Sequence, residues 1–169
     1  MKKYILSIIV IITIISCSTK TETKIIADKL DIHQFGFNYD SSANIDAVKA
    51  TNKDLENLDT TSYKTKFSDT VVFYDHEKNH NLNWNMSIFK NWISKKIQPK
   101  VTVGAIWGSK FNYKDGSKGD YVYQAIKMKF TQGIKSVEFD DFGVFEFKDG
   151  KIVREWNWYE ATKLLPLMK

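Results

Sequence analysis

The sequence has a single cysteine, Cys17, and only two prolines in 169 residues. One cysteine excludes internal disulfide bonds, so a domain of this length has to be stabilised by its apolar core. No apolar run reaches the roughly 20 residues that a membrane-spanning helix needs. The 25 basic and 20 acidic residues form no concentrated basic stripe, and nucleic acid is therefore not an expected partner.

The N-terminal segment has the pattern of an export signal. Two lysines precede an apolar run from Tyr4 to Ile15, after which the chain becomes polar. Ile14-Ile15-Ser16-Cys17 resembles the lipobox of bacterial lipoproteins, in which the cysteine carries lipid after cleavage. We expect a signal peptide at 1–16, then acylated Cys17 and a tether to residue 42. The resemblance implies a lipid anchor in a membrane of the bacterial cell envelope, with the domain outside the cytoplasm. In a bacterium with two membranes, the expected one is the outer membrane.

The rest of the chain, residues 43–169, carries the periodicities of one α+β domain. Apolar residues at helical spacing predict helices near residues 44–58, 60–67 and 86–97. A strand is predicted at Val71–Tyr74, followed by a loop from Asp75 to Asn83. Alternating segments after Val101, separated by Gly-containing turns, predict a meander of long strands that ends at Tyr159. This order predicts helices packed on one face of a curved sheet.

Two segments in this order resemble the nuclear transport factor 2-like superfamily, and especially its SnoaL-like branch. They are Phe67-Ser68-Asp69-Thr70-Val71-Val72-Phe73-Tyr74-Asp75 and Phe147-Lys148-Asp149-Gly150-Lys151-Ile152-Val153-Arg154-Glu155-Trp156. The resemblance implies an α+β fold with a cone-shaped curved antiparallel sheet, helices packed on its concave face, and a pocket between them. The superfamily includes isomerases, dehydratases, cyclases and non-catalytic binding or dimerisation modules, so the fold alone does not identify the function.

The ketosteroid isomerases of this superfamily provide a residue-by-residue comparison. Their general base, an Asp that closes the first strand, falls on Asp75 of this sequence. Their oxyanion hole needs a tyrosine and a protonated acid, but these positions fall on Thr51 and Gly143. The resemblance therefore implies a candidate general base, but steroid isomerase activity is not expected.

The same alignment with the superfamily indicates which side chains face the pocket. Large apolar rings mixed with a few polar groups are typical of small-molecule sites. Trp107, Met128 and Phe145 are equally compatible with an ordinary core. Trp156 and Trp158 are expected on the opposite face, against a helix or a second subunit. The predicted pocket residues are Trp107, Gln124, Met128, Asp141, Phe145, Val153, Glu155, Asn157 and Tyr159.

One motif suggests a metal site. His76-Glu77-Lys78-Asn79-His80 matches H-E-x-x-H, which binds zinc when both histidines share a helical face. Here the motif follows a strand and lies among Asn and Lys residues, so we expect a solvated loop, with a metalloprotease site and adventitious metal binding as the alternatives. No metal or other cofactor is predicted. Asp140 and Asp141 are adjacent strand residues that point to opposite faces, so only one of them can enter the pocket.

The leading functional prediction is a membrane-anchored module without established catalysis. It would bind a small, partly apolar molecule or another protein in its cone. The alternative is a proton-transfer enzyme, such as an isomerase, dehydratase or cyclase, with Asp75 as the general base and Tyr159, Asn157 or Glu155 orienting the substrate. A third prediction is a structural dimerisation module whose cone is filled by its own side chains. A small hydrophobic ligand and a second copy of the chain are thus the expected partners.

Overall fold

The computed structural model describes residues 38–40, 43–75, 78–113 and 115–168. Cys17, the predicted signal peptide and most of the predicted tether lie outside the described residues. One compact unit contains all the elements, leaving out the β4–β5 connection at 112–117. The elements are β1 (Asn38–Asp40), α3 (Ala43–Asn57), α4 (Thr60–Lys64), β2 (Phe67–Asp75), β3 (Lys78–His80), α5 (Leu82–Ser94), β4 (Gln98–Asn112), β5 (Lys118–Gln132), β6 (Lys135–Lys148), β7 (Lys151–Tyr159), η2 (Ala161–Leu164) and α6 (Leu165–Met168).

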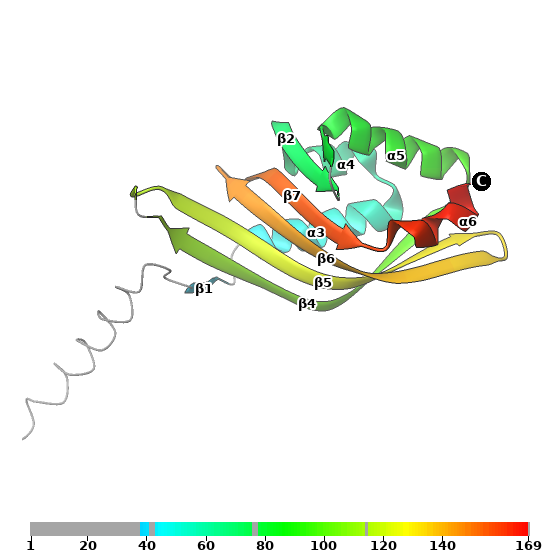
Figure 1. Cartoon of the computed structure of the whole chain (residues 1–169). Helices are drawn as coiled ribbons and strands as arrows, with labels where there is room; N and C mark the ends of the chain where they lie inside the picture. Colours follow the sequence, from blue (N-terminus) through cyan, green and yellow to red (C-terminus); the bar gives the residue numbers. More distant parts are fainter. Residues whose placement is uncertain (1–37, 41–42, 76–77, 114, 169) are drawn as a thin grey trace, which may run out of the picture. The chain divides into compact units, whose positions relative to one another are not determined.

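The strands form one curved sheet in the order β1-β4-β5-β6-β7-β2-β3 (Figure 1). β5, β6 and β7 are consecutive antiparallel neighbours, whereas β2 and β7 run parallel. The helices pack on the concave face, so the predicted α+β fold class is confirmed. The parallel pair places the C-terminal ends of β2 and β7 side by side, with Asp75 level with Asn157. No described helix has the length and apolar character needed to cross a membrane.

Apolar side chains from the sheet and all three longer helical segments form the core. Phe89 of α5 and Val48 of α3 are almost completely buried against the strands. On α5 the predicted stripe is confirmed at Met86, Phe89 and Trp92, but Ile93 is half exposed. The helix ends at Ser94, and the turn that follows buries Ile97 instead. The core clusters contain Val48, Tyr63, Phe67, Val71, Phe73, Met86, Phe89, Trp92, Ile97, Val122, Ile126, Met128, Phe130, Phe139, Phe145, Phe147, Ile152 and Leu167.

An extra residue in β7 decides which of its side chains reach the concave face. Glu146 pairs with Arg154, but the next residue, Phe147, pairs with Ile152, so Val153 has no partner in the ladder. Such a β-bulge reverses the alternation of side chains along the strand. Ile152 and Glu155 are therefore buried on the same face although they are three residues apart. The prediction that Val153 lines the pocket is wrong, because the bulge removes Val153 from the alternating pattern.

Several predicted boundaries differ from the structure at the edges of the sheet. Part of the predicted tether, Asn38–Asp40, forms β1 and pairs with β4. Part of the predicted loop, Lys78–His80, forms β3 and pairs with the end of β2. The helix predicted to reach Phe67 ends at Lys64. Exposed strand edges have unpaired backbone groups, so even short polar segments can add to them without an apolar alternation of their own.

Candidate functional site

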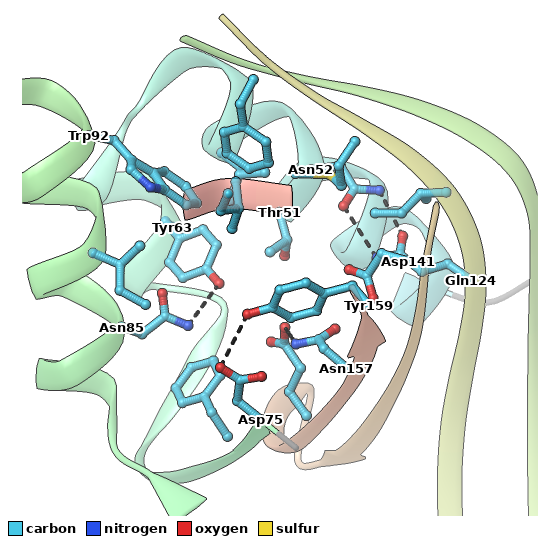
Figure 2. Close-up of a pocket in the computed structure, with 18 of the residues that line it drawn as sticks. Thr51, Asn52, Tyr63, Asp75, Asn85, Trp92, Gln124, Asp141, Asn157 and Tyr159 are labelled. Carbon is cyan, nitrogen blue, oxygen red and sulfur yellow. Dashed lines mark hydrogen bonds between the residues drawn. The ribbon is translucent and has the colours of Figure 1, made fainter. Parts of the chain in front are cut away.

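A half-open pocket of about 130 Å³ lies between the concave face of the sheet and α3, α4 and α5 (Figure 2). This volume is below the roughly 300–1,000 Å³ of pockets for drug-sized ligands, and near the roughly 150 Å³ of a cavity that holds benzene. The lining consists of Thr51, Asn52, Leu55, Tyr63, Phe73, Asp75, Trp84, Asn85, Ile88, Trp92, Gln124, Ile126, Met128, Phe130, Phe139, Asp141, Phe145, Glu155, Asn157, Tyr159 and Leu164.

Asp75 lies at the C-terminal end of β2 and faces this pocket. The Tyr159 hydroxyl donates a hydrogen bond to Asp75 Oδ2 over 3.1 Å, as Figure 2 shows. Burial and the negative charge of Asp75 raise the pKa of Tyr159, so this phenol remains a neutral donor at physiological pH. The parallel pairing of β2 with β7 brings these two side chains together although they are 84 positions apart in the sequence.

Asp141 comes from β6, where it is level with Tyr159 of β7. Burial is the main cause that raises its pKa to about 7, and the charge of Asp75 adds to the effect. Its Oδ1 atom accepts no hydrogen bond from any described residue. A carboxyl group that is partly protonated near neutral pH can both donate and accept a proton.

Glu155 is the most deeply buried acid of the pocket, with 7% of its surface exposed. Asn157 Nδ2 donates a hydrogen bond to Glu155 Oε1 over 2.7 Å, whereas Oε2 accepts none from the described residues. Burial raises the pKa of Glu155 to about 7; the hydrogen bond from Asn157 opposes this shift, and Asp141 adds to it. Three carboxyl groups thus converge in a pocket, and the part of its lining that the structure describes contains no Lys, Arg or His.

The helices add polar groups that the sequence analysis did not assign to the pocket. Asn85 of α5 donates to the Tyr63 hydroxyl at 3.5 Å, and Asn52 of α3 donates to Gln124 Oε1 at 2.8 Å (Figure 2). Burial raises the pKa of Tyr63 well above its usual value. A signal was present in the sequence, since Asn85 lies at helical spacing from apolar residues at 88 and 92.

The two positions that correspond to the oxyanion hole of the isomerases contain other groups. The Thr51 hydroxyl donates to the carbonyl of Ala47 in its own helix. At Gly143, an added Cβ would come within 3.1 Å of the Phe145 ring and 3.2 Å of Asn157 Oδ1. An acid at position 143 would therefore require these side chains to move.

The structure brings most of the predicted site residues together. Trp107 is the exception, and its assignment to the pocket is wrong. Its ring stacks on Tyr123, which faces away from the pocket because Tyr123 adjoins Gln124 in β5. The cause lies in β4, where the alternation of inward and outward side chains shifts by one residue. Val101 and Ile106 both pack on the core, although they are five positions apart and a regular strand would place them on opposite faces. Those that do line the pocket are Asp75, Gln124, Met128, Asp141, Phe145, Glu155, Asn157 and Tyr159.

The outer face of the sheet carries the remaining aromatic side chains. Trp156 stacks on Tyr74 of the neighbouring strand, and Trp158 is 52% exposed beside Phe142. Both tryptophans therefore lie on the face opposite the pocket, as expected. Asp140 is also exposed on this face, with its carboxylate 3.9 Å from Lys127 Nζ. This position separates Asp140 from Asp141, its neighbour in the pocket.

The residues of the H-E-x-x-H motif are only partly described. His76 and Glu77 lie outside the described residues, whereas His80 ends β3 and stacks on Trp84, with 3.5 Å between ring centroids. His80 thus belongs to a strand, not to a helix. In the described part of the chain, no three His, Cys, Asp or Glu side chains are grouped so that they could hold a metal ion.

No protein-family model and no curated protein matches this chain, but solved structures do. An LEH-like epoxide hydrolase from M. tuberculosis is 19% identical, with 74% of this chain and 88% of that chain covered and a TM-score of 0.56. A SnoaL-like polyketide cyclase from Agrobacterium tumefaciens is 12% identical, with coverages of 76% and 99% and a TM-score of 0.53. At these identities the likeness shows the fold alone, and it agrees with the α+β fold with a curved sheet that was expected from the sequence.

Proposed function

We propose that this pocket is the active site of an enzyme that transfers protons on a small molecule by general acid–base chemistry. The observation that carries the proposal is the convergence of Asp75, Asp141 and Glu155 in one largely apolar pocket, which has no basic side chain among the described residues that line it. The leading prediction from the sequence was a binding module. The structure favours the enzyme alternative, because an acid whose pKa is raised to about 7, Asp141, shares the pocket with a second carboxyl group.

Asp75 and Asp141 divide the acid and base roles between them. The negative charge of Asp75 helps to keep the proton on Asp141, so one carboxyl group can accept a proton while the other donates one. Asp75 would take a proton from a carbon next to a carbonyl group, or from a water molecule. Asp141 would give its proton to the substrate oxygen that gains negative charge. With a carbonyl substrate, the carbon loses one proton and the oxygen gains one. With a strained ether, the water oxygen bonds to a ring carbon as the C–O bond breaks, Asp75 takes the proton of the water, and Asp141 protonates the released oxygen. In both cases one acid gains a proton and the other loses one, so the total charge of the pocket is unchanged.

Two further observations support an enzyme with a small substrate. Solved structures with this fold include proteins named as an epoxide hydrolase and a polyketide cyclase, so the fold accommodates catalysis in other proteins. The volume of about 130 Å³ is suited to one six-membered ring and not to several fused rings. We therefore propose a monocyclic or short-chain substrate with a carbonyl or strained ether oxygen.

The Asp75→Asn variant tests this function. Asparagine cannot accept the proton, so we expect turnover to fall by about 100-fold or more while the melting temperature stays near that of the wild type. The measurement is hydrogen–deuterium exchange into cyclohexanone by NMR, together with hydration of cyclohexene oxide.

Asp140→Asn is the matched control, since it removes an exposed carboxylate from the opposite face of the sheet. It should retain the wild-type rate. A wild-type rate in Asp75→Asn would exclude Asp75 as the base. If the wild-type protein turns over neither probe, the binding module that was first predicted is the better account.

We also propose that the protein is a lipoprotein of the bacterial cell envelope. The support comes from the sequence, where Ile14-Ile15-Ser16-Cys17 follows a signal-like apolar run. Lipid on Cys17 would hold the domain at a membrane surface outside the cytoplasm. A homodimer remains a prediction, for which the exposed aromatic side chains of the outer face, Phe142 and Trp158, are the candidate surface.

A further inference from the structure

The acids of the pocket leave two hydrogen-bond acceptors without a partner. Glu155 is buried to more than nine-tenths, and Asn157 satisfies only its Oε1 atom. Glu155 Oε2 and Asp141 Oδ1 accept no hydrogen bond from the described residues. Buried polar atoms in proteins nearly always have a partner, and an exception calls for an explanation such as a catalytic role or a bound water molecule or ion. The lining of the pocket is therefore complementary to a molecule that donates hydrogen bonds.

The charge of the pocket limits the chemical class of molecule that can bind in it. Among the described residues, neither Asp141 nor Glu155 takes part in an ion pair, and the lining contains no basic side chain. A carboxylate or phosphate ligand would bring a further negative charge next to buried acids, which is strongly unfavourable. A cationic donor would instead compensate the charge of an ionised acid.

The walls of the pocket are also suited to a cation. Tyr63, Trp84 and Trp92 come from the helical side, and Phe145 and Tyr159 from the sheet. The faces of aromatic rings attract ammonium groups, and this attraction increases when the cation is removed from water. The small volume leaves room for about one ring with a short substituent.

We infer that the substrate of this pocket is a small primary amine in its ammonium form, and that Glu155 Oε2 accepts a hydrogen bond from the ammonium group. Asp75 and Asp141 are then left for the proton transfer at another atom of the same molecule. The inference rests on the proposed function and deepens it, because it names the substrate class of that site. Its test measures binding and does not depend on turnover.

The test compares three molecules that share one ring and differ in charge. Benzylamine, benzyl alcohol and benzoate are titrated into the full-length mature protein by isothermal calorimetry at pH 7. We expect benzylamine to bind about tenfold more tightly than benzyl alcohol, and benzoate not to bind. These titrations use only the wild-type protein, so they are valid even if a variant folds poorly.

The Glu155→Gln variant assigns the preference to one residue. Glutamine keeps the shape of the side chain but removes its charge, so we expect the affinity for benzylamine to fall about thirtyfold while that for benzyl alcohol is unchanged. Glu138→Gln, the same substitution on an exposed residue of β6, should bind both molecules like the wild type.

Three results would overturn the inference: no binding of benzylamine, equal affinity of the wild type for amine and alcohol, or unchanged amine binding in Glu155→Gln. The proposed function is judged separately by cyclohexanone exchange and cyclohexene oxide hydration. If exchange depends on Asp75 but amines do not bind, the enzyme proposal stands and only the substrate class is wrong. If amines bind but nothing is turned over, the pocket recognises amines without the proposed chemistry.

Discussion

Asp141 and Glu155 are costly to the folded protein when they are ionised. Burial is the main cause that raises the pKa of each to about 7, whereas ordinary values in unfolded chains are near 4. Between these values the folded state binds more protons than the unfolded state, so the free energy of unfolding decreases as pH rises. The contribution of these groups is fully present below about pH 4 and lost as pH rises through about 7.

Glu155→Gln should therefore remove part of this pH dependence. Relative to the wild type, we expect the variant to gain about 2–3 kcal/mol of stability between pH 5 and pH 8, because a shift of one pKa unit corresponds to about 1.4 kcal/mol. Urea unfolding of both proteins at the two pH values measures this difference. Glu138→Gln should follow the wild type, and an equal pH dependence in all three proteins would show that Glu155 ionises normally.

Whether a pocket residue belongs to a strand or to a helix explains which of them could be predicted from the sequence. Gln124, Asp141 and Asn157 were assigned from the sequence, because side chains alternate along strands and one buried position indicates the others. Asn52 and Asn85 were not assigned: Asn52 lies in a predicted helix, whereas Asn85 precedes the predicted start of α5, which begins at Leu82. The rotation of a helix above a sheet depends on how both surfaces pack together, and local periodicity does not define it.

Strand predictions were wrong where alternation is interrupted. In β4 the phase changes between Val101 and Ile106, and in β7 it changes at Val153. The interruption in β4 contains Gly104, and an isolated glycine inside a strand can mark a bulge, whereas nothing in the sequence around Val153 marks the one in β7. The turns were easier to predict, because Asp149 and Gly150 adopt the positive φ angles, 52° and 73°, that this residue pair accommodates in tight hairpins.

The β6–β7 hairpin provides a prediction about stability. Gly150→Ala should lower the free energy of unfolding by about 1–2 kcal/mol, because alanine is strained at a φ of 73°. An added Cβ would meet no atom within 4 Å, so the loss would come from the backbone alone. Urea unfolding measures it, with Ile134→Ala at the exposed β5–β6 turn as a control that should change little. Equal stabilities would mean that the hairpin adapts to the new residue.

For the molecule as a whole, the sequence predicted the fold class but not the residue at which the first strand of the sheet begins. The alternation of long apolar segments in residues 98–159 was sufficient for an α+β fold with a curved sheet. The position of β1 was not predictable, because Asn38–Asp40 contains no apolar pattern and joins the sheet only through backbone pairing with β4. The domain therefore begins before residue 43, the boundary expected from helical periodicity.

The proposed anchor gives a prediction for the whole protein. Cys17→Ser should move the protein from the membrane fraction to the soluble fraction of its host, because serine cannot carry the thioether-linked lipid. The measurement is immunoblotting after membrane sedimentation, and Ser18→Ala next to it is a control that should stay with the membrane. A membrane-bound Cys17→Ser protein would mean that another part of the chain holds it there.

The single unpaired residue of β7, Val153, lies between two parts of the strand that have different roles. Before Val153, the inward residue Ile152 is part of the apolar core, and after it, Glu155, Asn157 and Tyr159 are polar groups of the pocket. Deleting Val153 would make Ile152, Arg154 and Glu155 regular ladder neighbours, so the three polar side chains would stay on the concave face and only the local bend and twist of the bulge would be lost. The extra residue thus places a bend between the part of the strand that belongs to the core and the part that carries the polar groups of the pocket.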